Sequence, residues 1–291
     1  MIIVKLMGGL GNQMFQYAAG KALSIKHATP LLIDTTFLSQ APNGAYTKRE
    51  LELTVFDMPL LLANEKQLKQ FEVPKSRFQR IVQQVMPLRK SFRYAAERGM
   101  GYQSFFESLP ANTYLDGFWQ NERYFENQRE VLLNEFRPKE KMPPEIEKYA
   151  QLIHSKTTLS LHVRRGDYVT LQSAKDFHGV CDMTYYQKAL ALMAEKVGNF
   201  QVLIFSDDIA WCKQNFGNKG GIDFVEHKCN AVWDLMLMSM CNHNIIANSS
   251  FSWWGAWLNP HKNKIVTMPQ QWFTGVSAQQ IGINAKNWVL L

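Results

Sequence analysis

Short apolar segments alternate with segments of helical periodicity along most of the chain, and this alternation restricts the possible folds more than any other feature. The expected strands lie at residues 2–6, 30–34, 114–119, 158–163, 201–206, 222–225, 244–247 and, as the last one, 264–268. The expected helices lie at residues 12–25, 64–71, 76–89, 121–136, 184–197, 208–215, 230–241 and 252–258. Strands and helices that alternate in this way build parallel sheets covered by helices. The sequence therefore predicts an α/β fold with doubly wound parallel sheets.

A segment rich in proline and lysine, residues 138–144, separates the two halves of this pattern. Proline-rich segments between periodic segments are typical of linkers. The chain of 291 residues is long enough for two domains of ordinary size. We therefore expect one domain over residues 1–140 and a second over residues 141–291.

The charge of the chain is mildly basic and spread out. The sequence has 32 basic and 25 acidic residues and a net charge of +7. An acidic small substrate or an anionic membrane surface accounts for this balance as well as a nucleic acid would, and no basic tract favours nucleic acid. No window of about 18 apolar residues predicts a transmembrane helix, and the N-terminus lacks a signal-peptide pattern. These features predict a cytoplasmic protein, with peripheral contact at the inner face of the membrane as an alternative.

The segment at residues 159–168 joins a buried strand to a loop of charged residues. The loop begins after His162 and contains Arg164, Arg165 and Asp167, with a glycine between the charges. A guanidinium group presents a planar fork of donors that matches phosphate oxygens. In open α/β sheets the ligand lies beyond the carboxyl ends of the strands, where this loop is expected. The pattern favours diphosphate binding over the alternative of a surface salt-bridge turn.

Two further loops follow strands of the second half and are expected at the same edge of its sheet. One is residues 206–208, and the other is the hydroxyl-rich segment 248–252, which enters a helix whose free N–H groups favour phosphate. Asp234 precedes this second loop, near the start of a helix. It is either an ordinary charge at a helix start or a carboxylate that accepts the two adjacent N–H donors of guanine. Together these groups would describe a site for a guanine-nucleotide sugar.

The N-terminal glycine loop, with glycines at 8, 9 and 11, connects the first strand to a helix that Asn12 is expected to cap. Such a turn can bind an anion, but the spacing matches neither a dinucleotide fingerprint nor a P-loop. A tight turn that needs glycine geometry is the equal alternative. An aromatic cluster around Trp119 is expected in the core, with stacking on a sugar ring as the lesser alternative.

The sequence does not imply a metal. His227, Cys229, Cys241 and His243 could be combined into a zinc site, but their spacings are tighter than those of zinc knuckles. No Asp-x-Asp motif is present. If a diphosphate leaves during the reaction, arginine and backbone donors would have to stabilise its charge.

Several motifs in order along nearly the whole chain resemble those of the α-1,2-fucosyltransferases, glycosyltransferase family 11. They are HVRRGDY at 162–168, GGLGNQMFQ at 8–16, GFWQ at 117–120, and the segments 211–212, 241–243 and 248–258. The short chain is more similar to bacterial members than to Golgi members. The resemblance implies the GT-B fold, with two Rossmann-like domains facing across a cleft. It also implies inverting, metal-independent transfer of fucose from GDP-β-L-fucose to the 2-hydroxyl of a β-galactoside.

The same resemblance implies roles for individual residues. In the related enzymes an arginine loop binds the diphosphate of the donor. This role is expected here for Arg164 and Arg165, and His162 is expected to lie against the nucleotide. Guanine recognition falls on Asp234. The remaining assignments are Ser249 or Ser250 to phosphate, Asn12 to the fucose or diphosphate, and Asp116, Trp119 and Gln120 to the acceptor in the N-terminal domain.

The general base and the acceptor are the least determined parts of this hypothesis. Asp167, Asp116 and Glu122 are candidates for the base, and Asp167 is favoured because it shares the arginine loop. Lactose, N-acetyllactosamine and a lipid-linked glycan of a surface polysaccharide or O-antigen all present a terminal β-galactose. The alternatives to this function are another GDP-sugar glycosyltransferase and a catalytically silent nucleotide- or glycan-binding protein on the same fold.

Overall fold

The computed structural model describes residues 1–40, 49–71, 93–166, 179–217 and 220–291. These residues form two compact units, Met1–Lys139 and Glu140–Leu291, and each contains its own parallel sheet. The predicted α/β fold with parallel sheets is therefore confirmed in both units. The predicted helix 76–89 lies outside the described residues.

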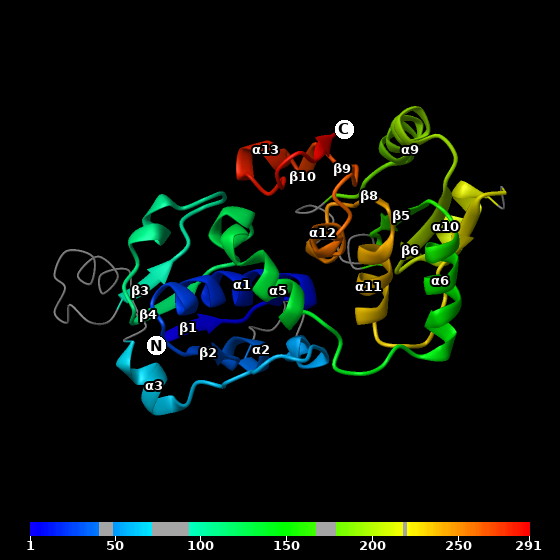
Figure 1. Cartoon of the computed structure of the whole chain (residues 1–291). Coiled ribbons are helices and arrows are strands. Elements are labelled where there is room, and N and C mark those ends of the chain that lie inside the picture. The colour runs from blue at the N-terminus through cyan, green and yellow to red at the C-terminus, as the bar shows by residue number, and fades with distance from the viewer. Residues whose placement is uncertain (41–48, 72–92, 167–178, 218–219) are drawn as a thin grey trace. The chain divides into compact units, whose positions relative to one another are not determined.

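The N-terminal unit is built on a four-stranded sheet in the order β2-β1-β4-β3, and all neighbouring strands are parallel (Figure 1). The strands are β1 (Ile2–Lys5), β2 (Leu31–Asp34), β3 (Arg93–Ala96) and β4 (Thr113–Asp116). The α-helices are α1 (Leu10–Lys26), α2 (Thr36–Gln40), α3 (Glu65–Gln70) and α5 (Arg129–Glu135). The 3-10 helices are η1 (Glu52–Val55), η2 (Ser104–Ser108), η3 (Glu122–Tyr124) and η4 (Glu126–Gln128).

Helix α1 packs against the sheet through small residues. A Cβ atom at Gly20 would lie 2.7 Å from Leu31 Cδ1, so glycine permits the close approach of α1 to the strands. Glu135 of α5 accepts from the Tyr17 hydroxyl of α1 at 3.0 Å and pairs with Lys21 at 2.5 Å. These contacts fix α1, and with it the glycine loop, relative to the sheet.

The structure corrects three expectations for this unit. Helix α1 begins at Leu10 after Gly9, so Asn12 lies inside the first turn and does not cap the helix. The strand expected at 114–119 ends at Asp116, because the chain turns at the buried Gly117 and at Trp119, which has a positive φ of 54°. The helix expected at 121–136 is two 3-10 turns followed by α5, since the Asn121 side chain accepts from Arg123 N and forms a local turn.

The C-terminal unit contains a larger set of elements. Its strands are β5 (Thr158–Val163), β6 (Gln201–Ser206), β7 (Ile222–Phe224), β8 (His243–Ile245), β9 (Val266–Met268), β10 (Gln271–Phe273), β11 (Val276–Ser277) and β12 (Val289–Leu290). Its helices are α6 (Pro144–Ser155), α9 (Met183–Val197), α10 (Ile209–Phe216), α11 (Val232–Met240), α12 (Ser250–Leu258) and α13 (Ala278–Ile281).

The main sheet of this unit is six-stranded and parallel, in the order β12-β9-β8-β5-β6-β7. Successive strands run from β5 to β7 in one direction, and the chain then returns to place β8, β9 and β12 on the other side of β5. This order is that of a Rossmann fold, with its switch point between β5 and β8. Helices α9 and α10 pack on one face of β5, and α6 lies beside α11 (Figure 1).

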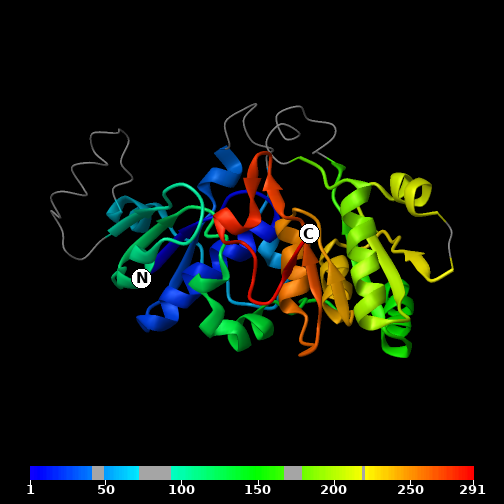
Figure 2. The same cartoon turned by 90° about the horizontal axis from the view of Figure 1, so that it is seen from above.

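The strand at 264–268 is not the last one, contrary to the prediction. A small antiparallel pair, β10 and β11, follows it, and β12 then brings the C-terminus back to pair with β9 (Figure 2). The strand β12 is only two residues long, which leaves too little alternation for a sequence pattern to reveal it.

No helix in the described ranges combines the length and apolar character that crossing a lipid bilayer requires.

Candidate functional site

The two arginines after β5 are each paired with an aspartate after the neighbouring strand β6. Arg164 Nη1 lies 2.9 Å from Asp207 Oδ2, and Arg165 Nε lies 3.1 Å from Asp208 Oδ2. Because β5 and β6 are adjacent and parallel, their carboxyl ends place the loops side by side. The two loops therefore form one charged cluster. The sequence predicted that both loops lie at this edge of the sheet, but it did not predict which arginine pairs with which aspartate.

Asp207 also fixes the backbone of the arginine loop. Its Oδ1 accepts from Arg165 N at 2.9 Å, and a Cβ atom at Gly166 would lie 2.5 Å from its Oδ2. The glycine between the charges is therefore required for close approach of the carboxylate. Asp167, the favoured base in the sequence hypothesis, lies outside the described residues.

Arg165 is held by an aromatic ring as well as by a carboxylate. Its guanidinium carbon lies 4.2 Å from the centroid of Trp211 on α10, a cation–π contact. Asp208 accepts from Trp211 N at 3.1 Å and so caps the same helix. Trp211 and Asp208 thus orient one guanidinium in a plane, which suits recognition of phosphate oxygens.

His162 is buried at the end of β5 and faces the hydroxyl-rich segment 248–252, the serine loop. Only 6% of its surface is exposed, and Nδ1 has no hydrogen-bond partner among the described residues. Burial lowers the pKa of His162 to about 4, against the opposing effect of Asp207. The ring is therefore neutral at physiological pH. Its centroid lies 6.0 Å from that of Phe251 on α12, which links the arginine loop to the serine loop.

The serine loop enters α12 on the other side of the switch point. Ser249 is the N-cap residue of α12, but its side chain makes no capping hydrogen bond. It is buried, whereas Ser250 is partly exposed. The N-terminus of a helix with an uncommitted hydroxyl is suited to bind a phosphate. The loops after β5 and β8 thus present cationic and hydroxyl groups on both sides of the switch point.

Asp234 lies in the first turn of α11 and is paired with a histidine. His227 Nε2 lies 2.8 Å from Asp234 Oδ1, and His227 Nδ1 accepts from Cys229 N at 3.2 Å. This arrangement places the ring proton on Nε2, so His227 donates to the carboxylate and leaves Oδ2 available. Burial raises the pKa of Asp234, while His227 lowers it. From the sequence, His227 was considered only for a zinc site and not as the partner of Asp234, because it lies outside the helix pattern.

One group of side chains in the described part of the chain has metal-ligating atoms close together. The ligand atoms of Glu145, His227 and Cys229 all lie within 4.8 Å of one another. Cys229 Sγ donates to Glu145 Oε1 at 3.2 Å. Desolvation is the largest cause of the raised pKa of this thiol, and the Glu145 carboxylate raises it further. A protonated thiol is a poor ligand. Cys241 and His243 do not join the group, so the zinc site considered from the sequence is not assembled.

The glycine loop of the N-terminal unit is organised by its own side chains. Gly8 has a φ of 74°, and Leu10 N donates to Glu52 Oε2 at 3.0 Å. A carboxylate of the protein thus already occupies the start of α1. This supports the tight-turn interpretation over an anion-binding nest, since a phosphate would be repelled by Glu52.

Asn12 and Gln120 contact each other at the switch point between β1 and β4. Gln120 Nε2 donates to Asn12 Oδ1 at 2.7 Å, although the two residues are 108 positions apart. Both are partly exposed. The structure therefore brings together one residue predicted for the donor and one predicted for the acceptor.

Asp116, another predicted acceptor residue, is committed to contacts within its unit. Its Oδ1 pairs with Lys5 Nζ at 3.1 Å, and its Oδ2 accepts from the Tyr94 hydroxyl. Glu122, a further candidate for the base, is the first residue of η3 and is partly exposed. The structure thus leaves Asp116 without an uncommitted oxygen for proton transfer.

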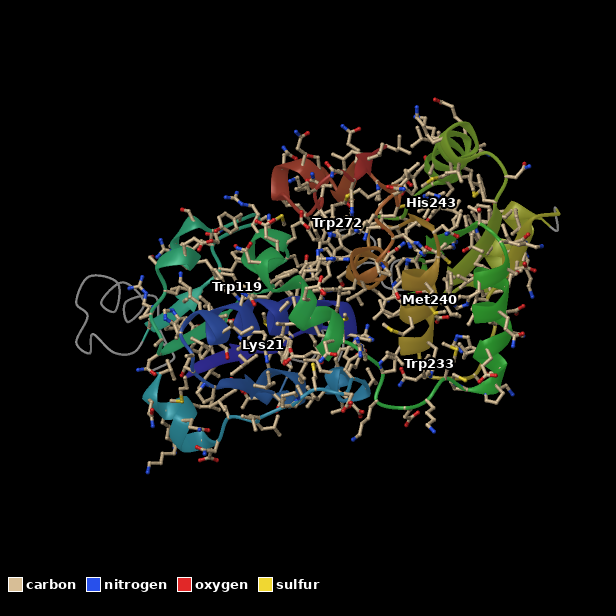
Figure 3. All side chains as sticks on the ribbon, in the orientation of Figure 1. Lys21, Trp119, Trp233, Met240, His243 and Trp272 are labelled. Atoms are coloured by element: carbon tan, nitrogen blue, oxygen red, sulfur yellow. The ribbon has the colours of Figure 1, made fainter. Side chains whose placement is uncertain are left out.

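Trp119 is a core residue of the N-terminal unit. Its side chain is fully buried inside the N-terminal unit (Figure 3). The centroid of its ring lies 5.3 Å from that of Tyr124, in an edge-on arrangement. Its Nε1 has no hydrogen-bond partner among the described residues. This matches the favoured core interpretation, and a buried ring presents no face for stacking on a sugar.

Glu97, an acidic residue beside the 117–120 turn, was not predicted as a site residue. Glu97 directly follows β3, and its carboxylate accepts from the backbone of the 117–120 turn. The strand β3 is four residues long and was not predicted. Without that strand, no signal in the sequence places Glu97 at the carboxyl edge of the sheet.

The sequence profile described as Glycosyl transferase family 11 matches residues 1–291. The chain is 33% identical over 307 residues to the O-antigen biosynthesis glycosyltransferase WbnK of Escherichia coli, a match that covers 98% of this chain and 99% of that protein. It is 32% identical over 294 residues to an alpha-1,2-colitosyltransferase of Escherichia coli, covering 99% and 98%. A shorter match, 31% identical over 105 residues, to the galactoside 2-alpha-L-fucosyltransferase Sec1 of Mus musculus covers 35% of this chain and 28% of that protein.

The profile match and the two relatives of similar length confirm the resemblance that the motifs predicted. Both kinds of comparison extend over nearly the whole chain and so include the arginine loop, the serine loop and the N-terminal glycine loop. The chain therefore belongs to glycosyltransferase family 11.

Proposed function

We propose that this chain transfers L-fucose from GDP-β-L-fucose to the 2-hydroxyl of a terminal β-galactoside, with inversion at the anomeric carbon. The acceptor is proposed to be a glycan of an O-antigen or a related surface polysaccharide. Lactose and N-acetyllactosamine are its small analogues. The single observation that carries this proposal is the arrangement of groups around the switch point of the C-terminal sheet.

The donor site is proposed to use Arg164 and Arg165 for the diphosphate and Ser249 or Ser250 for a phosphate oxygen. The paired aspartates and Trp211 support this assignment because they hold the guanidinium groups in place before a ligand binds. Preorganised donors stabilise the charge that develops on a leaving group, since they need no rearrangement during the reaction. No metal is included in this mechanism.

The base of the nucleotide is proposed to be guanine, recognised by Asp234. His227 supports this assignment by donating to Oδ1, which leaves Oδ2 to accept from the base. One carboxylate can accept both adjacent N–H donors of guanine. The neutral His162 lies on the same side of the sheet as α12 and is proposed to contact the nucleotide.

Two of the relatives support different sugars. The mouse relative is named as a fucosyltransferase, and a relative covering the whole chain is named as a colitosyltransferase. Colitose differs from fucose by the absence of the 3-hydroxyl. Transfer of colitose is therefore a second candidate function, favoured by the longer match.

The test is release of GDP from the donor, measured with EDTA present, with and without lactose. The donors compared are GDP-fucose, GDP-colitose and GDP-mannose. Lactose-dependent release from GDP-fucose, with a 2-linked product by mass spectrometry and methylation analysis, is the expected result. Release from GDP-colitose alone would replace fucose by colitose. Loss of activity in EDTA that added Mn²⁺ restores would contradict the metal-independent mechanism.

Binding without turnover has a separate meaning. Tight binding of GDP-fucose with no transfer to lactose, to N-acetyllactosamine or to a lipid-linked β-galactoside would favour a catalytically silent binding protein. Failure to bind any guanine nucleotide would reject the proposed donor site.

A further inference from the structure

Glu97 lies at the carboxyl edge of the N-terminal sheet, immediately after β3. Its backbone N–H donates to the Asp116 carbonyl at 2.9 Å, so the residue extends the pairing of β3 with β4. Its side chain turns toward the 117–120 segment, where Oε2 accepts from Phe118 N at 2.7 Å and from Trp119 N at 3.2 Å. The carboxylate is thus fixed by two backbone donors rather than by a flexible partner.

The turn that holds Glu97 is shaped around this carboxylate. A Cβ atom at Gly117 would lie 2.4 Å from Glu97 Cβ and 2.8 Å from its Oε2, so only glycine leaves room for the side chain. Trp119 has a φ of 54°, a conformation that costs a residue with a side chain about 1 kcal/mol or more. The two hydrogen bonds to Glu97 help to maintain this conformation.

The other oxygen of the same carboxylate is uncommitted. Within the described ranges, Oε2 is the oxygen that makes both hydrogen bonds of this side chain, and Oε1 makes none. The residue is partly exposed, and Oε1 is not among the fully buried side-chain atoms that lack a partner, so this oxygen is not closed off from solvent. A carboxylate anchored through one oxygen, with the other oxygen accessible, is suited to accept a proton in a defined direction.

Asp116, the other carboxylate at this edge, differs in this respect. Lys5 occupies its Oδ1, and the Tyr94 hydroxyl occupies its Oδ2. Neither oxygen of Asp116 is therefore left without a partner. Glu97 accepts from backbone groups alone and has no cationic partner among the described residues.

The pKa of Glu97 is raised, mainly because the side chain is buried. Burial raises the pKa of Glu97, its two backbone hydrogen bonds lower it, and the nearby Asp116 raises it further. Titratable groups near this region, among the described residues, include Lys5 and Tyr94, which are both bound to Asp116. They also include Tyr124 of η3, whose own pKa is raised by burial and by Glu97.

Glu97 is also connected to the residues assigned to the substrates. The turn fixed by its carboxylate ends at Gln120, whose amide donates to Asn12 at the switch point of the sheet. The carboxylate and the Asn12–Gln120 pair therefore belong to one edge of one unit. An acceptor sugar bound there would meet both amide and carboxylate groups.

Resting on the proposed function, we propose that Glu97 is the general base of the transfer reaction. Its Oε1 accepts the proton of the acceptor 2-hydroxyl as that oxygen forms a bond to C1 of the donor sugar. The bond between C1 and the β-phosphate oxygen breaks at the same time, and its electron pair leaves with GDP. The product carries the inverted linkage, and Glu97 ends the step as a neutral acid.

The test compares Glu97→Gln with the wild type, using the donor and acceptor that the wild type turns over. The amide oxygen of glutamine can still accept from Phe118 N and Trp119 N, while its NH₂ replaces the uncommitted oxygen. We expect kcat to fall at least about 100-fold, with the melting temperature and the Kd for GDP unchanged. Glu126→Gln, which removes an exposed carboxylate of the same unit, is the matched control and should leave kcat unchanged.

Two further readouts separate a base from a positioning residue. In the wild type, kcat should fall at acid pH as Glu97 becomes protonated, and this limb should be absent from the residual activity of Glu97→Gln. In Glu97→Ala, added formate should restore part of kcat by acting as a replacement base.

A kcat for Glu97→Gln within about threefold of the wild type would overturn the proposal. A large loss of kcat with the acid limb retained and no rescue by formate would also overturn it, by assigning Glu97 to positioning the turn. Failure of the proposed function gives a different result, because the wild type itself would then transfer no sugar to any β-galactoside.

Discussion

At the scale of residues, Arg164 and Arg165 are neighbours with different environments. Arg164 pairs with Asp207 at 2.9 Å, whereas Arg165 pairs with Asp208 and stacks on Trp211. The contact of Arg165 with Asp208 uses Nε, and a guanidinium has further N–H donors. The two pairs hold the arginines in place at the end of β5.

Arg164→Ala should reduce kcat/KM at least about 100-fold, corresponding to about 3 kcal/mol of lost transition-state stabilisation. The reason is the loss of a charge-assisted contact with the diphosphate as it leaves. Steady-state kinetics and a melting curve provide the measurement, and the melting temperature should stay within a few degrees. Arg137→Ala, at an exposed arginine, is the control. Normal kinetics in Arg164→Ala would remove this residue from the donor site.

Asp234→Asn should weaken binding of GDP about tenfold or more while UDP binding, if any, stays the same. The amide offers one acceptor oxygen where the guanine edge presents two donors, and it also changes the contact with His227. Isothermal titration calorimetry with both nucleotides measures the difference. An equal change for both would indicate a general disturbance of α11.

His162 should make the folded protein less stable in acid. Burial lowers its pKa to about 4, whereas an unfolded chain has an ordinary value near 6.5. Between these values the unfolded chain binds a proton that the folded protein does not, so the free energy of unfolding falls as pH falls through this window. The stabilisation is fully present above it.

The expected loss from this residue between pH 7 and pH 5 is about 2 kcal/mol. Urea titrations at both values, on the wild type and on His162→Gln, measure it. The variant should show a smaller pH dependence of the unfolding free energy. An unchanged dependence would mean that other groups cause the acid sensitivity.

At the scale of elements, the contact between α11 and α12 positions the serine loop. A Cβ atom at Gly255 of α12 would lie 2.9 Å from Met238 Cβ of α11, so the helices approach as closely as glycine allows. Helix α12 begins with the residues proposed to bind phosphate. Its distance from α11 therefore affects both stability and the site.

Gly255→Ala should destabilise the protein by about 1–3 kcal/mol, because the helices must separate to admit a methyl group. The better helix propensity of alanine offsets less than this. Thermal unfolding and GDP titration are the measurements, and both stability and affinity should fall. Gly220→Ala is the matched control, since it has open space within 4 Å and no positive φ. Equal stability of the two variants would show that α11 and α12 can separate without cost.

At the scale of the whole molecule, each unit carries its own sheet and core. The C-terminal unit completes its sheet with β12, which returns the end of the chain to β9. The residues proposed for guanine and for phosphate oxygens all belong to this unit. A unit with its own sheet and core is expected to fold by itself.

A fragment of residues 140–291 should therefore unfold cooperatively and bind GDP, although more weakly than the full chain. A fragment of residues 1–139 should not bind GDP. Circular dichroism melts and calorimetry on both fragments measure this. Cooperative folding of the C-terminal fragment without GDP affinity would show that the nucleotide site requires the N-terminal unit.

Several features of this protein were determined by the sequence alone, because they depend on local patterns. The strands at 158–163 and 201–206 have the predicted bounds, since apolar runs with turn residues at both ends define a buried strand. The arginine loop and the serine loop were located for the same reason: each directly follows a recognisable strand. Family membership also followed from motifs within the sequence.

Other features were decided only by tertiary structure, because they depend on residues far apart in the chain. The sequence identified the arginines but not that Asp207 and Asp208 hold them, and it placed Asn12 at a helix cap rather than against Gln120. Glu97 follows β3, whose single buried residue, Ala95, gives no apolar run that would predict a strand. The periodicity of apolar residues in a sequence indicates which side of a helix or strand is buried. The partner of a polar side chain depends instead on the order of the strands in the sheet, which no local pattern contains.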